Sequence, residues 1–117
     1  MFDAINNLHP HRRSAESEKL FKAPEWKLID GAAVKFSDVK VHEFTMGDVE
    51  DPDLYAAQPI MAWQTSEAGQ YIMEHAVDTP FWHRMINPYN YGWTYYIIAR
   101  LKEQDHTYWA LKWKQSS

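Results

Sequence analysis

The residues best suited to acid–base chemistry or metal binding are histidines and carboxylates in the middle of the chain. His75 directly follows Glu74, and His83 lies beyond a break at Pro80. Such side chains serve as general bases or metal ligands. Neighbours one position apart on a helix point in different directions, so Glu74 and His75 do not form a pair. We expect His75 to be a buried, neutral packing residue, and we assign no catalytic residue and no metal ligand.

An acidic segment offers oxygen ligands of the kind that Ca²⁺ and Mg²⁺ prefer: Asp48, Glu50, Asp51 and Asp53. The alternation of acidic and other residues in this segment resembles part of a calcium-binding loop. Counted from Asp48, however, the sixth and twelfth positions are Asp53 and Pro59, where such a loop needs a glycine and a bidentate glutamate. We interpret the acids as a helix entry, where negative charge is favoured by the positive end of the helix. The chain is therefore predicted to need no cofactor.

Signatures of nucleophilic or nucleotide-dependent catalysis are missing from the sequence. There is no Gly-x-Ser-x-Gly, no phosphate-binding glycine loop and no Gly-x-Gly-x-x-Gly. Only four glycines are present to build such loops. These observations favour a non-catalytic protein.

Charge is segregated along the chain, whose formal net charge is −4. Residues 41–83 contain no lysine or arginine and eight carboxylates. These are Glu43, Asp48, Glu50, Asp51, Asp53, Glu67, Glu74 and Asp78. An acidic surface attracts basic proteins and repels nucleic-acid phosphates. The pattern predicts a basic protein partner.

A helix predicted over about 59–77 carries the strongest candidate for a binding anchor. At 100° per residue it has an apolar stripe from Met61 to Ala76, and Gly69 beside the stripe allows close approach of another backbone. Trp63 falls on the opposite, polar face. If a short helix over 80–86 or the N-terminal arm covers Trp63, it is instead a core residue. The predicted partner-binding residues are Trp63, Glu67, Gln70, Glu74, Asp48, Glu50, Asp51 and Asp53.

The order of elements predicts a small α+β fold. We expect an extended N-terminal arm over 1–13 and a single domain over 14–117. The domain should hold a short helix over 15–22, an extended segment over 26–29, a turn at Asp30-Gly31, a strand over about 38–46, the helix 59–77, the short helix 80–86 and a C-terminal hairpin, 93–101 with 106–113. The sheet made by these strands should pack against the main helix.

Two registers of the C-terminal hairpin are open, and they differ in which residues share a face. One pairs Ala99 with Tyr108. The other pairs Ala99 with Trp109 and is preferred, because it gathers the apolar side chains on one face. That face would hold Tyr95, Ile97, Ala99, Leu101, Trp109, Leu111 and Trp113, and the other face Arg100, Tyr108 and Lys112. Trp109 and Leu111 are thus predicted core residues.

The hairpin supports an alternative function. Tyr91, Gly92, Trp93 and Tyr96 fit in type the aromatic strand of RNA-recognition modules. The basic residue and glycine that open that motif are replaced by Tyr89-Asn90, so we do not assign the family. A stacking platform on an open hairpin face would still suit single-stranded nucleic acid. It would comprise Tyr96, Tyr108, Arg100 and Lys112.

The composition of the chain limits the classes of protein to which it could belong. The 117 residues include no cysteine and are 15% aromatic. Neither a secretory signal at Met1–Pro10 nor a membrane span is indicated, so we expect the cytoplasm, or a host cytoplasm for a viral protein. A short, Trp-rich chain without active-site motifs is common among small phage-encoded accessory proteins. We rank a non-catalytic interaction domain first, a single-stranded nucleic-acid binder second, and a small metal-dependent hydrolase using His75, His83 and the acidic loop third.

Overall fold

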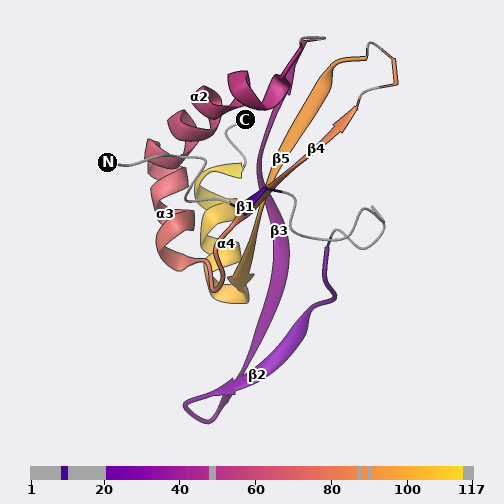
Figure 1. Ribbon diagram of the computed structural model, residues 1–117. Coiled ribbons are helices and arrows are strands. Elements are labelled where there is room, and N and C mark those ends of the chain that lie inside the picture. The colour runs from indigo at the N-terminus through magenta and orange to yellow at the C-terminus, as the bar shows by residue number, and fades with distance from the viewer. Residues whose placement is uncertain (1–8, 11–20, 48–49, 87, 90, 115–117) are drawn as a thin grey trace.

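The chain folds into one five-stranded sheet with helices on one of its faces (Figure 1). The computed structural model describes residues 9–10, 21–47, 50–86, 88–89 and 91–114. The strands are β1 (His9–Pro10), β2 (Glu25–Ile29), β3 (Ala32–Met46), β4 (Phe81–Ile86) and β5 (Trp93–Lys102), and the helices are α2 (Pro52–Thr65), α3 (Glu67–His75) and α4 (Glu103–Lys112). The strand order is β1-β4-β5-β3-β2, with β1 parallel to β4 and the other pairs antiparallel. The predicted α+β class is confirmed.

The N-terminal predictions fall largely outside the described residues. Of the arm expected over 1–13, only His9–Pro10 are described, and they pair with β4. Of the helix expected over 15–22, only Phe21 and Lys22 are described, and both precede β2. The division into an arm and a domain over 14–117 therefore stays a prediction.

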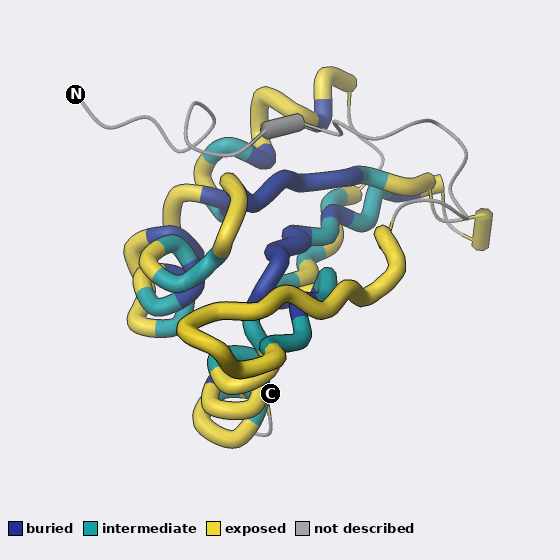
Figure 2. The backbone as a smooth tube through the Cα atoms, turned by 90° about the horizontal axis from the view of Figure 1, so that it is seen from below, coloured by how far each residue is buried: buried dark blue, intermediate teal, exposed yellow. Residues whose placement is uncertain are grey.

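Strand β5 lies at the centre of the sheet and contributes several residues to the hydrophobic core. Tyr95, Ile97, Ala99 and Leu101 alternate along it, are almost fully buried, and pack against the helices. Ile98 faces the other way and packs with Phe81. Figure 2 shows the buried residues concentrated in the central strands. A central strand covered on both faces loses the polar alternation of a half-exposed one, which explains its continuous apolar run.

Strands β2 and β3 form a long hairpin. Asp30 and Gly31 both have positive φ, 52° and 82°, which is the pattern of a two-residue turn matched to strand twist. The predicted turn and the extended segment over 26–29 are both present. β3 begins at Ala32 rather than near residue 38, because its first half pairs with β2 and its second half with β5. The hairpin extends past the helices (Figure 1).

A buried ion pair fixes the base of this hairpin on the face of the sheet opposite the helices. Nη1 of Arg100 lies 2.8 Å from Oδ1 of Asp38, and both side chains are buried. Its Nη2 donates to Oε1 of Glu25 and to the carbonyl of Ala23, each at 3.2 Å. Burial works against the charge of Arg100, but Asp38 and Glu25 outweigh it and raise its pKa. The guanidinium thereby ties the start of β2 to the central strand.

The predicted C-terminal hairpin is wrong, because its second strand is the helix α4. Trp109 is buried, as expected, but Leu111 is 66% exposed. Residues two apart share a face in a strand and lie about 200° apart on a helix, so one element cannot bury both. Glu103 and Asp105 in the first turn and Lys112 in the last turn match the helix dipole, a signal that the strand interpretation overlooked.

The predicted helices also differ from the observed ones. The helix expected over 59–77 is two helices: α2 begins seven residues earlier, at Pro52, continues through Pro59, and ends before Ser66, where α3 is capped. The short helix expected over 80–86 is instead strand β4. The local signal for a helix start at Asp78-Thr79-Pro80, a capping residue followed by a proline, is overridden by pairing with β5.

Candidate protein-interaction surface

The outward side of α2 exposes several large apolar side chains. Pro52, Ala56, Ile60 and Trp63 recur every three to four residues and are buried beneath the helix. We define the opposite side as the α2 outer face: Leu54, Tyr55, Gln58, Met61, Ala62 and Thr65. Leu54 is 70% exposed, Tyr55 57% and Met61 40%. All these residues recur at helical spacing, so they form one continuous surface.

The composition of the α2 outer face is unusual for a helix in contact with water. No charged residue lies between Asp53 and Glu67 in the sequence. A surface helix normally places charged residues opposite its buried stripe, and a helix that is apolar on both sides is normally covered on both. A contiguous exposed apolar surface is typical of an interaction site. Leu54 and Tyr55 are therefore candidate anchors.

Carboxylates lie at both ends of this face. Glu50 and Asp51 precede α2 and are exposed. Glu67 and Glu74 are exposed on α3, and with Gln70 they lie at three- and four-residue spacing on one side of that helix. None of these carboxylates forms an ion pair with another residue in the described part of the chain. The predicted residue Asp48 lies outside the described residues.

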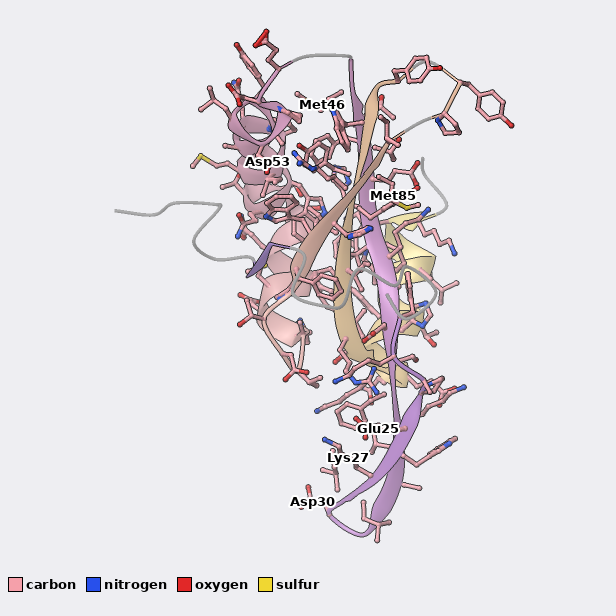
Figure 3. The ribbon with its side chains drawn as sticks, turned by 45° about the vertical axis from the view of Figure 1, so that its right-hand side comes forward. Glu25, Lys27, Asp30, Met46, Asp53 and Met85 are labelled. Atoms are coloured by element: carbon pink, nitrogen blue, oxygen red, sulfur yellow. The ribbon has the colours of Figure 1, made fainter. Side chains whose placement is uncertain are left out.

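Asp53, another predicted partner-binding residue, is engaged within the chain. Its Oδ1 accepts a 2.6 Å hydrogen bond from the phenol of Tyr95 and a 2.8 Å bond from Nη1 of Arg84. Figure 3 shows Asp53 in the first turn of α2. Because these bonds join α2 to β4 and β5, Asp53 serves the fold and is a poor candidate for an interface contact.

The expectation that Trp63 is an exposed anchor is wrong. Its side chain is 5% exposed and belongs to the core under α2. The expectation assumed one regular helix over 59–77, which placed Met61 inward and Trp63 outward. The break at Ser66 separates the two helices, so α2 takes its own orientation, buries Trp63 with Ile60, and turns Met61 toward solvent.

The histidines proposed for acid–base chemistry are not brought together. His75 is half buried rather than buried as expected, stacks on Tyr71 at 4.0 Å, and donates from Nδ1 to the Tyr71 carbonyl at 2.7 Å. His83 is buried on the face of the sheet opposite the helices, paired with Tyr96. The described residues hold no group of three or more potential ligands for a metal ion. The hydrolase alternative therefore finds no site in the described part of the chain.

The stacking platform proposed for nucleic acid is not formed. Tyr96 and Arg100 lie on β5, where Arg100 is buried in its ion pair. Tyr108 and Lys112 lie on α4, where Tyr108 stacks on Tyr71 and Lys112 lies 5.7 Å over the Tyr108 ring. Tyr96 and Arg100 are on the face of the sheet opposite the helices, whereas Tyr108 and Lys112 are on one of those helices, so the four side chains are not brought together.

A bulge in β3 opens a groove beside α4. The pairing with β5 shifts between Lys40 and His42, which places Val41 and His42 on the same side of the strand. A groove of about 500 Å³ lies there, bounded by these residues and by Trp63, Trp109 and Trp113 among others. His42 stacks on Trp63 at 5.9 Å, and burial, partly offset by Glu43, lowers its pKa. Nothing in the sequence pattern indicated this bulge.

Leu54 and Tyr55 were missed because Pro59 was interpreted as the start of a helix. The signal that locates them was present in Asp51-Pro52, where a capping residue precedes a proline at the first helical position. Pro59 is tolerated within the helix although it has no N–H. The backbone carbonyl left without that hydrogen bond is the one of Tyr55, which is exposed, so water can bind it.

Comparison with known proteins gives no relative: no protein-family model, no curated protein and no solved structure matches the chain. In the described part of the chain, none of the helices is long and apolar enough to cross a membrane.

Proposed function

We propose that this chain is a non-catalytic protein-interaction domain that binds a basic, partly apolar segment of another protein. The observation that carries the proposal is the α2 outer face, which exposes Leu54 and Tyr55 and lacks charge along its length. The predicted acidic helical surface is retained, and its apolar anchors become Leu54 and Tyr55 in place of Trp63.

The two features of this surface would act on different parts of binding. Burial of Leu54, Tyr55 and Met61 would slow dissociation, because a few fully buried side chains near the centre of an interface contribute most of the affinity. Glu67 and Glu74 on α3 would speed association with a positively charged partner. A partner with an apolar centre and lysine or arginine at its ends complements both.

We place this interaction in the cytoplasm, or in a host cytoplasm if the protein is viral, and assign the protein to the phage-type accessory class. The cysteine-free composition fits a reducing compartment. A small domain that acts by binding, without a catalytic centre, fits an accessory role.

The experiment is a comparison of two leucines with similar exposure. Leu54 on α2 is 70% exposed and Leu111 on α4 is 66% exposed. Leu54→Glu and Leu111→Glu therefore make the same chemical change on two different surfaces, and neither should unfold the chain. Proteins captured from a cell lysate by the wild-type chain are quantified against both variants, and captured proteins are then purified for rate measurements.

We expect Leu54→Glu to lose a captured protein that Leu111→Glu retains. For that protein, Glu67→Lys combined with Glu74→Lys should slow association several-fold and reverse its dependence on salt. Equal recovery by the wild type and Leu54→Glu would show that the α2 outer face is not the binding site.

A further inference from the structure

The outer edge of β2 is unpaired in the described part of the chain. β2 is the last strand in the order, and no described strand pairs with its outer side. All five of its residues are exposed, and it lies on the part of the hairpin that extends past the helices (Figures 1 and 3). A free edge of this kind is a template for pairing with another strand.

The turn decides which backbone groups of β2 are directed outward. In a two-residue hairpin the residues that flank the turn, here Ile29 and Ala32, form the closing hydrogen-bonded pair. Bonding alternates along an antiparallel ladder, so Lys27 and Glu25 also direct their N–H and C=O groups toward β3. The backbone groups of Trp26 and Leu28 are then directed toward the free edge, where they are available to a further strand.

The two sides of β2 carry different side chains, and only one of them carries charge. Trp26 is 62% exposed and Leu28 78%, and both lie on the side of the sheet that the helices cover elsewhere. Glu25, Lys27 and the exposed Ile29 lie on the other side, with Nζ of Lys27 5.2 Å over the ring of Phe36. The edge therefore presents opposite charges on one side and two large apolar groups on the other.

We propose that β2 pairs antiparallel with β2 of a second copy of this chain, about a two-fold axis at Trp26. In this register Trp26 lies opposite Trp26 of the second copy. Each Glu25 lies opposite Lys27 of the other copy, which gives two ion pairs on the opposite side. The dimer thus completes a continuous ten-stranded sheet from two five-stranded ones.

Charge complementarity selects this register over its neighbour. In the register centred on Trp26, Leu28 lies opposite Pro24 of the second copy, which has no N–H, so the carbonyl of Leu28 has no backbone donor there. If Trp26 were opposite Leu28 of the second copy, the outward backbone groups of both residues would pair, but the two Lys27 side chains would lie directly opposite each other. Like charges in that position destabilise a strand pair. Only the register centred on Trp26 brings each Lys27 opposite a carboxylate.

The start of β2 is already held in place within one copy of the chain. Arg100 holds Glu25 and the carbonyl of Ala23, and Oδ2 of Asp38 accepts a 2.8 Å bond from the backbone N–H of Lys22. These contacts fix the start of β2, so less conformational freedom is lost on association. Glu25 is still half exposed and can accept a second donor.

Single cysteines in this cysteine-free chain test both the pairing and its register. Directly opposite residues in a hydrogen-bonded pair have Cα atoms about 5.5 Å apart, which a disulfide spans. Under mild oxidation Trp26→Cys should give a covalent dimer, and Lys27→Cys should remain uncrosslinked. A crosslink through Lys27→Cys alone would overturn the register and with it the charge argument. Absence of any crosslink through Trp26→Cys would overturn the pairing.

Sedimentation equilibrium of the full chain supplies the second test. The mass of the wild type should rise with concentration from 13.9 kDa toward twice that value. Lys27→Glu replaces two attractions with two repulsions and should raise the dimer dissociation constant about tenfold or more. Added salt should then strengthen the variant dimer and weaken the wild-type dimer. A wild type that stays at 13.9 kDa at all concentrations would overturn the inference.

The matched control is Lys112→Glu, which makes the same charge change on exposed α4. It should dimerise as the wild type does, and equal weakening by both variants would show that only net charge matters. The inference does not rest on the proposed function, because β2 and the α2 outer face are separate surfaces. Leu54→Glu should leave the dimer unchanged.

Discussion

The phenol of Tyr95 donates a 2.6 Å hydrogen bond to Oδ1 of Asp53, joining the central strand to the first turn of α2. Tyr95 is fully buried, and Arg84 completes the group by donating to the same carboxylate oxygen. The α2 outer face is held in place by this contact, since Asp53 precedes Leu54 on the same helix. The acid next to the candidate surface thus positions the helix that carries it.

This contact predicts a loss of stability at alkaline pH. Burial, followed by the hydrogen bond to Asp53, raises the pKa of Tyr95 to about 12, from 10.0. Between these values the unfolded chain has lost the phenolic proton while the folded chain retains it. The free energy of unfolding should therefore fall as pH rises from about 10 to about 12.

Tyr95→Phe is the control for this pH dependence. Other tyrosines and lysines also titrate in this range, so the comparison is made between the two proteins by urea unfolding below pH 10 and near pH 11. The variant should have a lower free energy of unfolding than the wild type below pH 10. Between that pH and pH 11 its free energy of unfolding should fall by less than that of the wild type. Parallel losses in the two proteins would contradict the assigned role of Tyr95.

Gly69 predicts a second measurable effect, because it lies directly against the end of α2. A Cβ added to Gly69 would be 1.7 Å from the carbonyl oxygen of Trp63, whereas one added to Gly47 would meet nothing within 4 Å. The close approach expected beside Gly69 is thus present. Gly69→Ala should lower the free energy of unfolding by about 3 kcal/mol, since the contact is with backbone that cannot move aside easily.

Gly47→Ala is the matched control and should change stability by less than about 0.5 kcal/mol. Thermal and urea unfolding of both variants measure the difference. If Gly69→Ala were as stable as Gly47→Ala, the junction between α2 and α3 would have to be arranged differently around Ser66.

The two large apolar residues of α4 give a third prediction. Trp109 is 4% exposed and Leu111 66%. Trp109→Ala should cost about 3–5 kcal/mol through the lost burial and the cavity left behind. Leu111→Ala should change the free energy of unfolding by less than about 0.5 kcal/mol. Urea unfolding separates the helix from the strand interpretation, because a strand would make both substitutions costly.

Local signals in the sequence were sufficient for several elements. Asp30-Gly31 predicted a tight turn, because few residue pairs adopt two positive φ angles at low cost. The aromatic and β-branched run from Trp93 predicted β5. Trp109 is buried as predicted, but that prediction rested on the alternation of a strand, whereas Trp109 lies on a helix. These signals are local in origin, so the α+β class could be predicted without knowledge of the tertiary contacts.

The sequence by itself determined the composition of the surfaces, including an acidic segment without lysine or arginine. Only the tertiary structure decided which side chains reach the surface. Residues 81–86 form a strand, against their local helix signal, because they pair with an edge of β5. Trp63 is buried because the break at Ser66 sets the rotation of α2 independently of α3. A residue's exposure depends on the phase of its helix and on what packs against it, and neither is encoded within a short window of sequence.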